Sequence, residues 1–449
     1  MTPFQTLAPS PRLRAAVAFA GPALLVAVLL LLLITISTGS TIGAGFAVAM
    51  AVGLCLVLAA GFEGAAIALF ALGIALSPLD RLRPVAALGI ASLSDLILFA
   101  ALGLLIPVLM GRPFPREPLY LAGASGLFIV GIVSSVLSDN PVGSLAFLMR
   151  LAIGALLLPI VFSWWRPRRE VLIAFAASYV AGNILNLGFA FTVGVVDFGR
   201  RLGYSTHPNI MGLAAMLGFA LCPFLWTVLP KAYRWTALAG AAGCGLGVWV
   251  SGSRAALLAL AAVIVLYVVF SRSVGVAVTL FGAAIPVAYF VAQAYLKGDD
   301  SSDNALGRLF GGGSAGGSDV AREQLAQEAW DSFQKHPVIG QGLAEILEAH
   351  NIYLQVAAGI GVIGLAVYLV MLGSVFLRAA RLPDPYVLLV LPVMGYAIIG
   401  AMTTILWDRY VWTVLALPFL IPALSRPDPS SDDPEDRGEL VGSGQRLDV

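Results

Sequence analysis

The sequence predicts an all-α polytopic membrane protein with about 12–14 transmembrane helices and one long loop that contains a short helix. Hydrophobic residues make up 59% of the 449 residues and charged residues only 11%, whereas soluble domains contain roughly 25% charged residues. Apolar segments close to the roughly 20 residues that span a bilayer as a helix recur from Ala15 to Leu424. We therefore expect membrane lipids around the helices. The net charge is only +1, so we expect no nucleic-acid partner.

The apolar segments give about 14 candidate spans. They begin near Ala15, Gly43, Ala65, Ala87, Leu119, Leu145, Val171, Ile210, Trp235, Ala255, Val274, Ile352, Tyr386 and Arg409. The first segment has no small-residue cleavage site and precedes further spans, so we interpret it as a retained helix rather than a signal peptide. Residues 1–296 then hold about 11 helices, residues 297–351 form the long loop, and residues 352–425 hold the last helices. The acidic tail 426–449, rich in Pro, Ser and Gly, is expected to be a disordered cytoplasmic extension.

The distribution of basic residues orients these helices. The cluster Trp164-Trp-Arg-Pro-Arg-Arg169 is typical of the cytoplasmic side, and Lys231 with Arg234 and Arg378 with Arg381 give the same orientation. Counting outward from these anchors places the connections 196–209, 251–254, 297–351 and 406–409 on the outer face. All three histidines, His207, His336 and His350, therefore lie on that face.

Arginines also gather on the outer face, against the positive-inside rule. They are Arg81, Arg83, Arg200, Arg201, Arg254, Arg308, Arg322 and Arg409, with Arg150 inside a span on its outer half. An arginine near the bilayer centre costs about 2.5–3.5 kcal/mol on insertion scales. A phosphate-bearing ligand would explain this collection, because guanidinium groups bind phosphate oxygens in pairs. The alternatives are that Arg200 and Arg201 anchor a span at lipid headgroups, that Arg150 satisfies a buried polar group, and that Asp408 and Arg409 pair with each other.

Neither the cysteines nor the acidic residues of the outer face predict a metal site. Cys55, Cys222 and Cys244 lie in apolar segments without the close spacing of metal ligands or of a disulfide framework. Asp299, Asp300 and Asp303 lie in a flexible part of the long loop. We therefore expect no metal and no other cofactor.

The long loop divides into three parts. Its Gly-, Ser- and Asp-rich first part, up to Ser318, indicates flexible chain. The segment Ser318–Lys335 has apolar residues at helical spacings, and we expect a helix over the membrane face with Ser318 or Asp319 as N-cap. The third part contains a proline and two glycines and returns the chain to the bilayer by a turn.

His350 lies where the loop becomes the next span. Asn351 is a suitable N-cap for a helix from Ile352, which puts His350 at the positive end of the helix dipole and disfavours its imidazolium form. A neutral imidazole accepts a proton near physiological pH, so His350 is a candidate general base. The alternative is an interfacial histidine that bonds to the backbone.

The segment "HPVIGQGLAEILEAHNIYLQVAAGIGVIGLAVYL" resembles the signature of the O-antigen ligase and polysaccharide polymerase superfamily. The matching features are Pro337, Gly340-x-Gly342, His350-Asn351-x-Tyr353-Leu354, Gly359-x-Gly361 and Gly364. Three further segments, "RLGYSTHPNIMG", "VSGSRAALLAL" and "SDVAREQLAQEAW", are similar to family elements in the expected order. The resemblance covers roughly Arg200 to Leu377.

The resemblance implies a metal-independent inverting glycosyltransferase of the membrane C-type in the bacterial inner membrane, with its active site facing the periplasm. The implied donor is a glycan on undecaprenyl pyrophosphate, and the acceptor is lipid A-core or another growing glycan. By position His350 would be the general base, and Arg201 and Arg254 would hold the donor pyrophosphate. Arg322, Asn351, Arg150 and His207 would support them; His207 stands where the family often has Asn. Ligase and exopolysaccharide polymerase stay open, because both use the same donor.

Two other classes of protein share some of these features. A transporter or flippase of lipid-linked glycan also needs basic groups and many spans, but it requires a charged path through the bilayer. The predicted inner halves of the spans carry almost no ionisable residues. A structural membrane protein would leave the set of His350, Arg201 and Arg254 without a reason.

Overall fold

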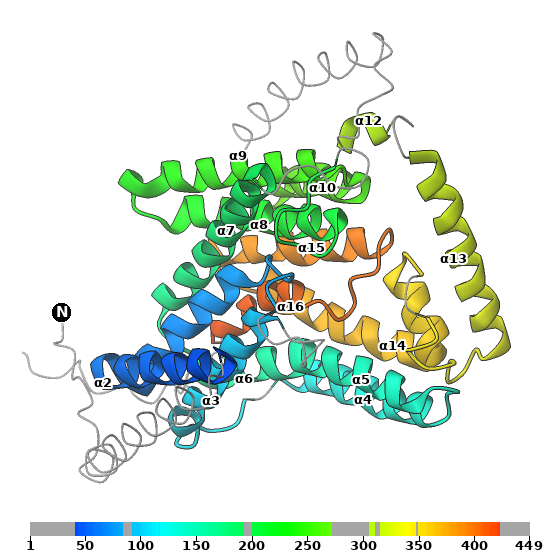
Figure 1. Ribbon diagram of the computed structural model, residues 1–449, viewed down its shortest axis with the longest axis horizontal. Helices are drawn as coiled ribbons and strands as arrows, with labels where there is room; N and C mark the ends of the chain where they lie inside the picture. The colour runs from blue at the N-terminus through cyan, green and yellow to red at the C-terminus, as the bar shows by residue number, and fades with distance from the viewer. Residues whose placement is uncertain are drawn as a thin grey trace, which may run out of the picture.

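The computed structural model describes residues 41–83, 92–115, 117–192, 200–271, 305–309, 315–346 and 349–422. Within these ranges every regular element is a helix, and seven helices are long and apolar enough to cross a membrane. The prediction of an all-α polytopic membrane protein is confirmed. Most of the helices run side by side, and one, α13, lies across their ends (Figure 1).

The helices in chain order have the following bounds. The first half contains α2 (Thr41–Leu76), α3 (Leu93–Leu109), α4 (Pro118–Val136), α5 (Pro141–Ala152), η2 (Ile153–Leu157), α6 (Leu158–Trp165), α7 (Arg169–Thr192), α8 (Pro208–Val228) and η3 (Lys231–Tyr233). The second half contains α9 (Arg234–Ser251), α10 (Arg254–Ser271), α12 (Ala305–Leu309), α13 (Ala315–Lys335), α14 (Ile352–Ala380), η4 (Tyr386–Leu389), α15 (Val390–Gly400), α16 (Arg409–Leu415) and η5 (Leu417–Leu420).

The predicted spans from Gly43 and from Ala65 are not separate. Both lie in α2, which is broken at Gly61 by a positive φ of 73° without an intervening loop. Glycine adopts this backbone at little steric cost, so one helix bends where the sequence indicated two spans. The predicted spans near Ala15 and Val274 lie outside the described residues, and the one predicted near Ala87 begins there, with α3 starting at Leu93.

The helix α8 forms the centre of the bundle, since 72% of its most apolar stretch is buried. Glycines allow this close packing. A Cβ atom on Gly212 would lie 2.4 Å from Ser251 Oγ of α9, and one on Gly218 would lie 2.9 Å from Cys244 Sγ. By contrast α10 has 17% of its most apolar stretch buried and leaves its apolar surface for lipid.

The return from the long loop is docked into a break in α14. Gly361 has a φ of 80°, and Gly342 N and Val362 N donate to Gly359 O (2.8 Å) and Pro337 O (2.8 Å). A Cβ atom on Gly361 would lie 2.0 Å from Val338 O, and one on Gly340 would lie 2.4 Å from Gly359 C. The backbones of Gly340 and Gly342 and of Gly359 and Gly361 therefore pack directly against each other, because none of them has a side chain. This contact positions the chain that continues to His350.

The helix α13 differs from its prediction at the start. It begins at Ala315, so Ser318 and Asp319 lie inside the helix and the N-cap prediction is wrong. Gly316 and Gly317 are poor helix formers, which is why the sequence indicated a later start. The prediction of flexible chain up to Ser318 is also wrong for α12, whose Arg308 is 1% exposed and donates to Gly252 O at 2.9 Å.

A cluster of ion pairs lies at the end of α14 opposite to His350. Glu117 accepts a hydrogen bond from Ser163 and pairs with Arg378 at 3.3 Å. Ser163 directly precedes the Trp164–Arg169 cluster, so that cluster and Arg378 lie at the same end of the bundle. This is the end that the sequence predicted to be cytoplasmic.

Candidate active site

The connections predicted to lie on the outer face contact one another in succession around one end of the bundle. Asp80, after α2, accepts hydrogen bonds from Thr206 N (2.8 Å) and Thr206 Oγ1 (2.6 Å). Arg201 N in turn donates to Val250 O at 3.1 Å. The loop before α8 is thereby fixed to the end of α2 on one side and to the end of α9 on the other.

The helix α13 continues this chain of contacts. Near its start Asp319 binds Arg254 of α10, with one bond of 2.9 Å from Nη1 to Oδ2 and a shorter one from Nη2 to Oδ1. Near its end Ala329 packs against Ile346 and Ala349, beside His350. One helix therefore connects the arginine predicted to bind phosphate with the segment that carries the predicted base.

Two arginines pair with the carboxylate of Asp319. Arg322 approaches the same carboxylate at 3.4 Å, and the field of Arg308 also acts on it. Hydrogen bonding from Arg254 holds the pKa of Asp319 below its ordinary value, so it is ionised at neutral pH. Partial burial and the neighbouring Arg254 lower the pKa of Arg322. Two guanidinium groups, those of Arg254 and Arg322, share this one carboxylate and form an environment that attracts a further anion.

Arg200 and Arg201 divide their roles. Arg200 is 6% exposed and donates to Ser251 O (2.9 Å) and Asn209 Oδ1 (2.6 Å), so it ties the loop to α9 and α8. Arg201 is partly exposed, donates from Nη1 to Ala190 O at 2.7 Å, and lies 4.8 Å from the ring centre of Phe191. Arg201 is the partly accessible guanidinium of this pair.

His207 is the N-cap of α8. Its Nδ1 accepts a hydrogen bond from Asn209 N at 3.1 Å, the bond that an N-cap Asn side chain makes at a helix start. An accepting Nδ1 carries no proton, so this geometry belongs to the neutral ring. His207 is exposed, so its ring lies outside the core.

His350 and Asn351 form the start of α14 as the sequence predicts. Asn351 Oδ1 accepts from Leu354 N at 3.1 Å and caps the helix. His350 has a left-handed φ of 49° and donates from its backbone N to Thr404 Oγ1 at 2.9 Å. Its side chain is partly exposed. The meeting of His350 with Arg201 and Arg254 in one pocket stays a prediction.

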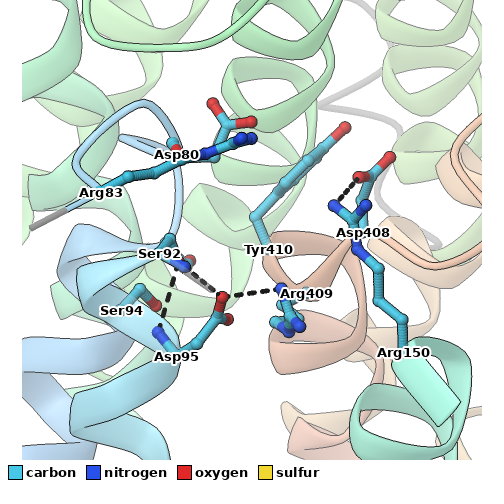
Figure 2. Close-up of a pocket in the computed structure, with 10 residues that line it drawn as sticks. Asp80, Arg83, Ser92, Ser94, Asp95, Arg150, Asp408, Arg409 and Tyr410 are labelled. Atoms are coloured by element: carbon cyan, nitrogen blue, oxygen red, sulfur yellow. Dashed lines mark hydrogen bonds and ion pairs between the residues drawn. The ribbon is translucent and has the colours of Figure 1, made fainter. Parts of the chain in front are cut away.

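A polar cavity lies at the end of connection 401–408, whose Thr404 accepts the hydrogen bond from His350 N. Thr404 and Asp408 belong to this connection, and Asp408 pairs with Arg150 at 3.8 Å while Arg409 pairs with Asp95 at 2.7 Å (Figure 2). The predicted pairing of Asp408 with Arg409 is therefore wrong, because buried charges on neighbouring helices compete for both. The cavity measures about 20 Å³, room for a water molecule. Its lining consists of Ser77, Asp80, Arg83, Ser92, Ser94, Asp95, Arg150, Asp408, Arg409 and Tyr410.

The charges around this cavity are balanced. Three aspartates face three arginines, and Arg150 lies against Asp408, which supports the interpretation that Arg150 satisfies a buried polar group. Burial raises the pKa of Asp408 to about 6. Among the described residues Tyr410 Oη and Asp95 Oδ1 are buried without a hydrogen-bond partner. The cavity therefore suits a polar, uncharged group, whereas the arginines around Asp319 suit an anion.

The sequence does not predict the roles of two of these residues. It indicates Asp319 only as a possible N-cap and gives no partner for Asp95, in the first turn of α3. Their partners lie far along the chain: Arg254 is 65 residues from Asp319. The only signal in the sequence for the role of Asp319 is its position three residues before Arg322, an arginine predicted to lie on the outer face. Within the described residues no group of acidic, histidine or cysteine side chains is arranged to hold a metal ion.

Comparison with known families gives one match. A family model described as O-antigen ligase matches residues 237–369. This segment starts in α9 and ends in α14, so it includes Arg254, Arg322 and His350, while Arg201 lies before it. No curated protein matches the chain.

Proposed function

We infer that the chain is a ligase- or polymerase-type enzyme of the O-antigen ligase and polysaccharide polymerase superfamily, which the match at residues 237–369 supports. We further propose that it is an inverting, metal-independent glycosyltransferase of the bacterial inner membrane. The donor is a glycan on undecaprenyl pyrophosphate, and the acceptor hydroxyl belongs to lipid A-core or to a growing O-antigen or exopolysaccharide chain. The reaction takes place at the periplasmic face.

One observation carries this proposal. Within the matched segment two guanidinium groups, those of Arg254 and Arg322, pair with the single carboxylate of Asp319, and the helix that carries this carboxylate packs beside His350. Guanidinium groups bind phosphate oxygens by paired hydrogen bonds and stabilise charge that develops on a leaving group. Arg254, with Arg201 from the neighbouring loop, is the proposed binder of the donor pyrophosphate.

The proposed chemistry needs one proton transfer. Neutral His350 accepts the proton of the acceptor hydroxyl, whose oxygen attacks the anomeric carbon of the donor glycan. The bond from that carbon to the phosphate oxygen breaks, and undecaprenyl pyrophosphate leaves with the electron pair. General base catalysis typically contributes about 10²–10⁴-fold. The backbone bond to Thr404 and the Asn351 cap position the imidazole.

The test supplies purified full-length protein with undecaprenyl-pyrophosphate glycan and two acceptors, lipid A-core and a second lipid-linked repeat unit. Extension of either acceptor, unaffected by EDTA, supports the enzyme and identifies it as ligase or polymerase. Protein that moves the intact donor across a vesicle membrane without joining it to either acceptor would instead support the transporter and exclude the proposed reaction.

A further inference from the structure

Asp319 contacts Arg254 in the way that a phosphate group would. Both carboxylate oxygens accept from the guanidinium, Oδ2 from Nη1 at 2.9 Å and Oδ1 from Nη2. This paired geometry is the one in which arginine binds phosphate. The side chain of Arg254 is 16% exposed, so the carboxylate occupies much of the surface by which it could bind another anion.

The first half of α13 has few other attachments. Among the described side chains of α13, the buried ones are Ala329 and Ser332, and both lie in the second half of the helix. This half packs against the segment before His350. In the first half Asp319 and Val320 are exposed, Val320 to 59%. Among the described side-chain contacts of this half, the pair of Asp319 with Arg254 of α10 is the one that holds it on the bundle, because Arg322 lies on α13 itself.

We propose that Asp319 is an internal competitor for the donor site: it occupies Arg254 in the empty enzyme, and the pyrophosphate of the donor displaces it. This inference rests on the proposed function for the identity of the donor. Displacement requires a ligand that interacts with the arginines more strongly than one carboxylate does. Pyrophosphate, with at least two charges, meets this condition better than a monoanion, so Asp319 determines specificity by charge. When undecaprenyl pyrophosphate leaves, the carboxylate returns and prevents its rebinding.

Displacement also changes the position of α13. Once Asp319 leaves Arg254, the first half of the helix loses its main attachment, while the second half stays packed beside His350. The structure therefore predicts that an anionic ligand increases the motion of α13 near Val320 and leaves its motion near Ala329 unchanged.

The first experiment compares Asp319→Asn with Asp331→Asn in the full-length protein. Asp331 lies on the same helix and accepts a hydrogen bond from Gln327 at 2.8 Å, so it controls for the loss of one negative charge from α13. With inorganic pyrophosphate as the probe, we expect Asp319→Asn to bind about fivefold tighter than wild type, the upper end for releasing an exposed ion pair. We expect Asp331→Asn and Asp319→Glu to bind as wild type does. Unchanged or weaker binding by Asp319→Asn would overturn the proposal.

A second measurement follows α13 itself. A spin label at Val320 should become more mobile when pyrophosphate is added to wild type, and it should already be mobile in Asp319→Asn. A label that stays equally immobile in both proteins would also overturn the proposal. Neither readout requires glycan transfer. If pyrophosphate changes binding and label mobility as expected but no glycan is transferred, only the proposed function is refuted. If glycan is transferred but these two changes are absent, only the role of Asp319 is refuted.

Discussion

His350 is fixed in place by its backbone. Its φ of 49° is left-handed, and its N–H donates to Thr404 Oγ1, while the next residue caps α14. A left-handed backbone is uncommon outside glycine and is less unfavourable for Asn, Asp and His than for other residues. The sequence could predict the cap from Asn351, but not the bond to Thr404, 54 residues away.

Substitutions of His207 distinguish a role in capping α8 from a role in the reaction. Replacing it with Ala removes the N-cap bond to Asn209, and we expect a loss of stability of about 1 kcal/mol. Replacing it with Asn should restore the cap. Thermal unfolding in detergent should therefore rank Asn close to wild type and Ala below it. A variant with Asn that folds stably but lacks transfer would show that the imidazole itself takes part in the reaction.

Asp408 should titrate near neutral pH. Burial raises its pKa from 3.8 to about 6, so between these values the folded protein holds a proton that the unfolded chain has released. Through this group, stability therefore falls as the pH rises across that window and changes no further above it. Infrared spectra should show a protonated-carboxyl band that disappears with a midpoint near pH 6. The same band in Asp408→Asn would assign it to another residue.

At the scale of elements, the two glycine pairs of the family-like signature explain how the long loop returns. Glycines at the spacing of Gly359, Gly361 and Gly364 often let neighbouring membrane helices approach closely. Instead, Gly359 and Gly361 admit the backbone of the segment from Pro337 to Gly342. The difference arises because helix packing and loop docking both require the absence of a side chain, so glycine spacing alone does not separate them.

Replacement of Gly361 by Ala should be strongly destabilising. A φ of 80° with a ψ of 178° is a backbone conformation essentially restricted to glycine and costs another residue about 1–3 kcal/mol, and the new Cβ atom would lie 2.0 Å from Val338 O. Gly373→Ala is the matched control on the same helix, since nothing lies within 4 Å of its added Cβ atom. We expect a lower melting temperature and lost transfer for the first variant and neither effect for the second. Equal melting temperatures would contradict the docking described here.

For the molecule as a whole, hydropathy predicted the class of fold. The distribution of charged residues predicted which connections lie at the same end of the bundle. Neither predicted the contacts around the outer end. These join the loop after α2 to the loop before α8, the latter to α9, and Arg254 of α10 to α13. Such pairings lie up to 126 residues apart and follow from helix packing, which a single sequence does not specify.

The choice between the two polar regions is also a property of the whole molecule. Arginines appeared equivalent in the sequence, because each was an unexplained positive charge on the outer face. In the fold, Arg150 and Arg409 are paired with aspartates around a balanced cavity, whereas Arg254 and Arg322 share the single carboxylate of Asp319. The partners, rather than the arginines, decide which region we propose as the phosphate site.

The most direct test of the proposed site replaces His350 with Asn in full-length protein in nanodiscs. Asn tolerates the left-handed backbone and keeps the N–H bond to Thr404, but it cannot act as the base. Binding of undecaprenyl-pyrophosphate glycan should equal that of wild type, while transfer to the acceptor should fall by about 10²–10⁴-fold. Transfer at the wild-type rate, or a parallel loss of donor binding, would contradict the role assigned to His350.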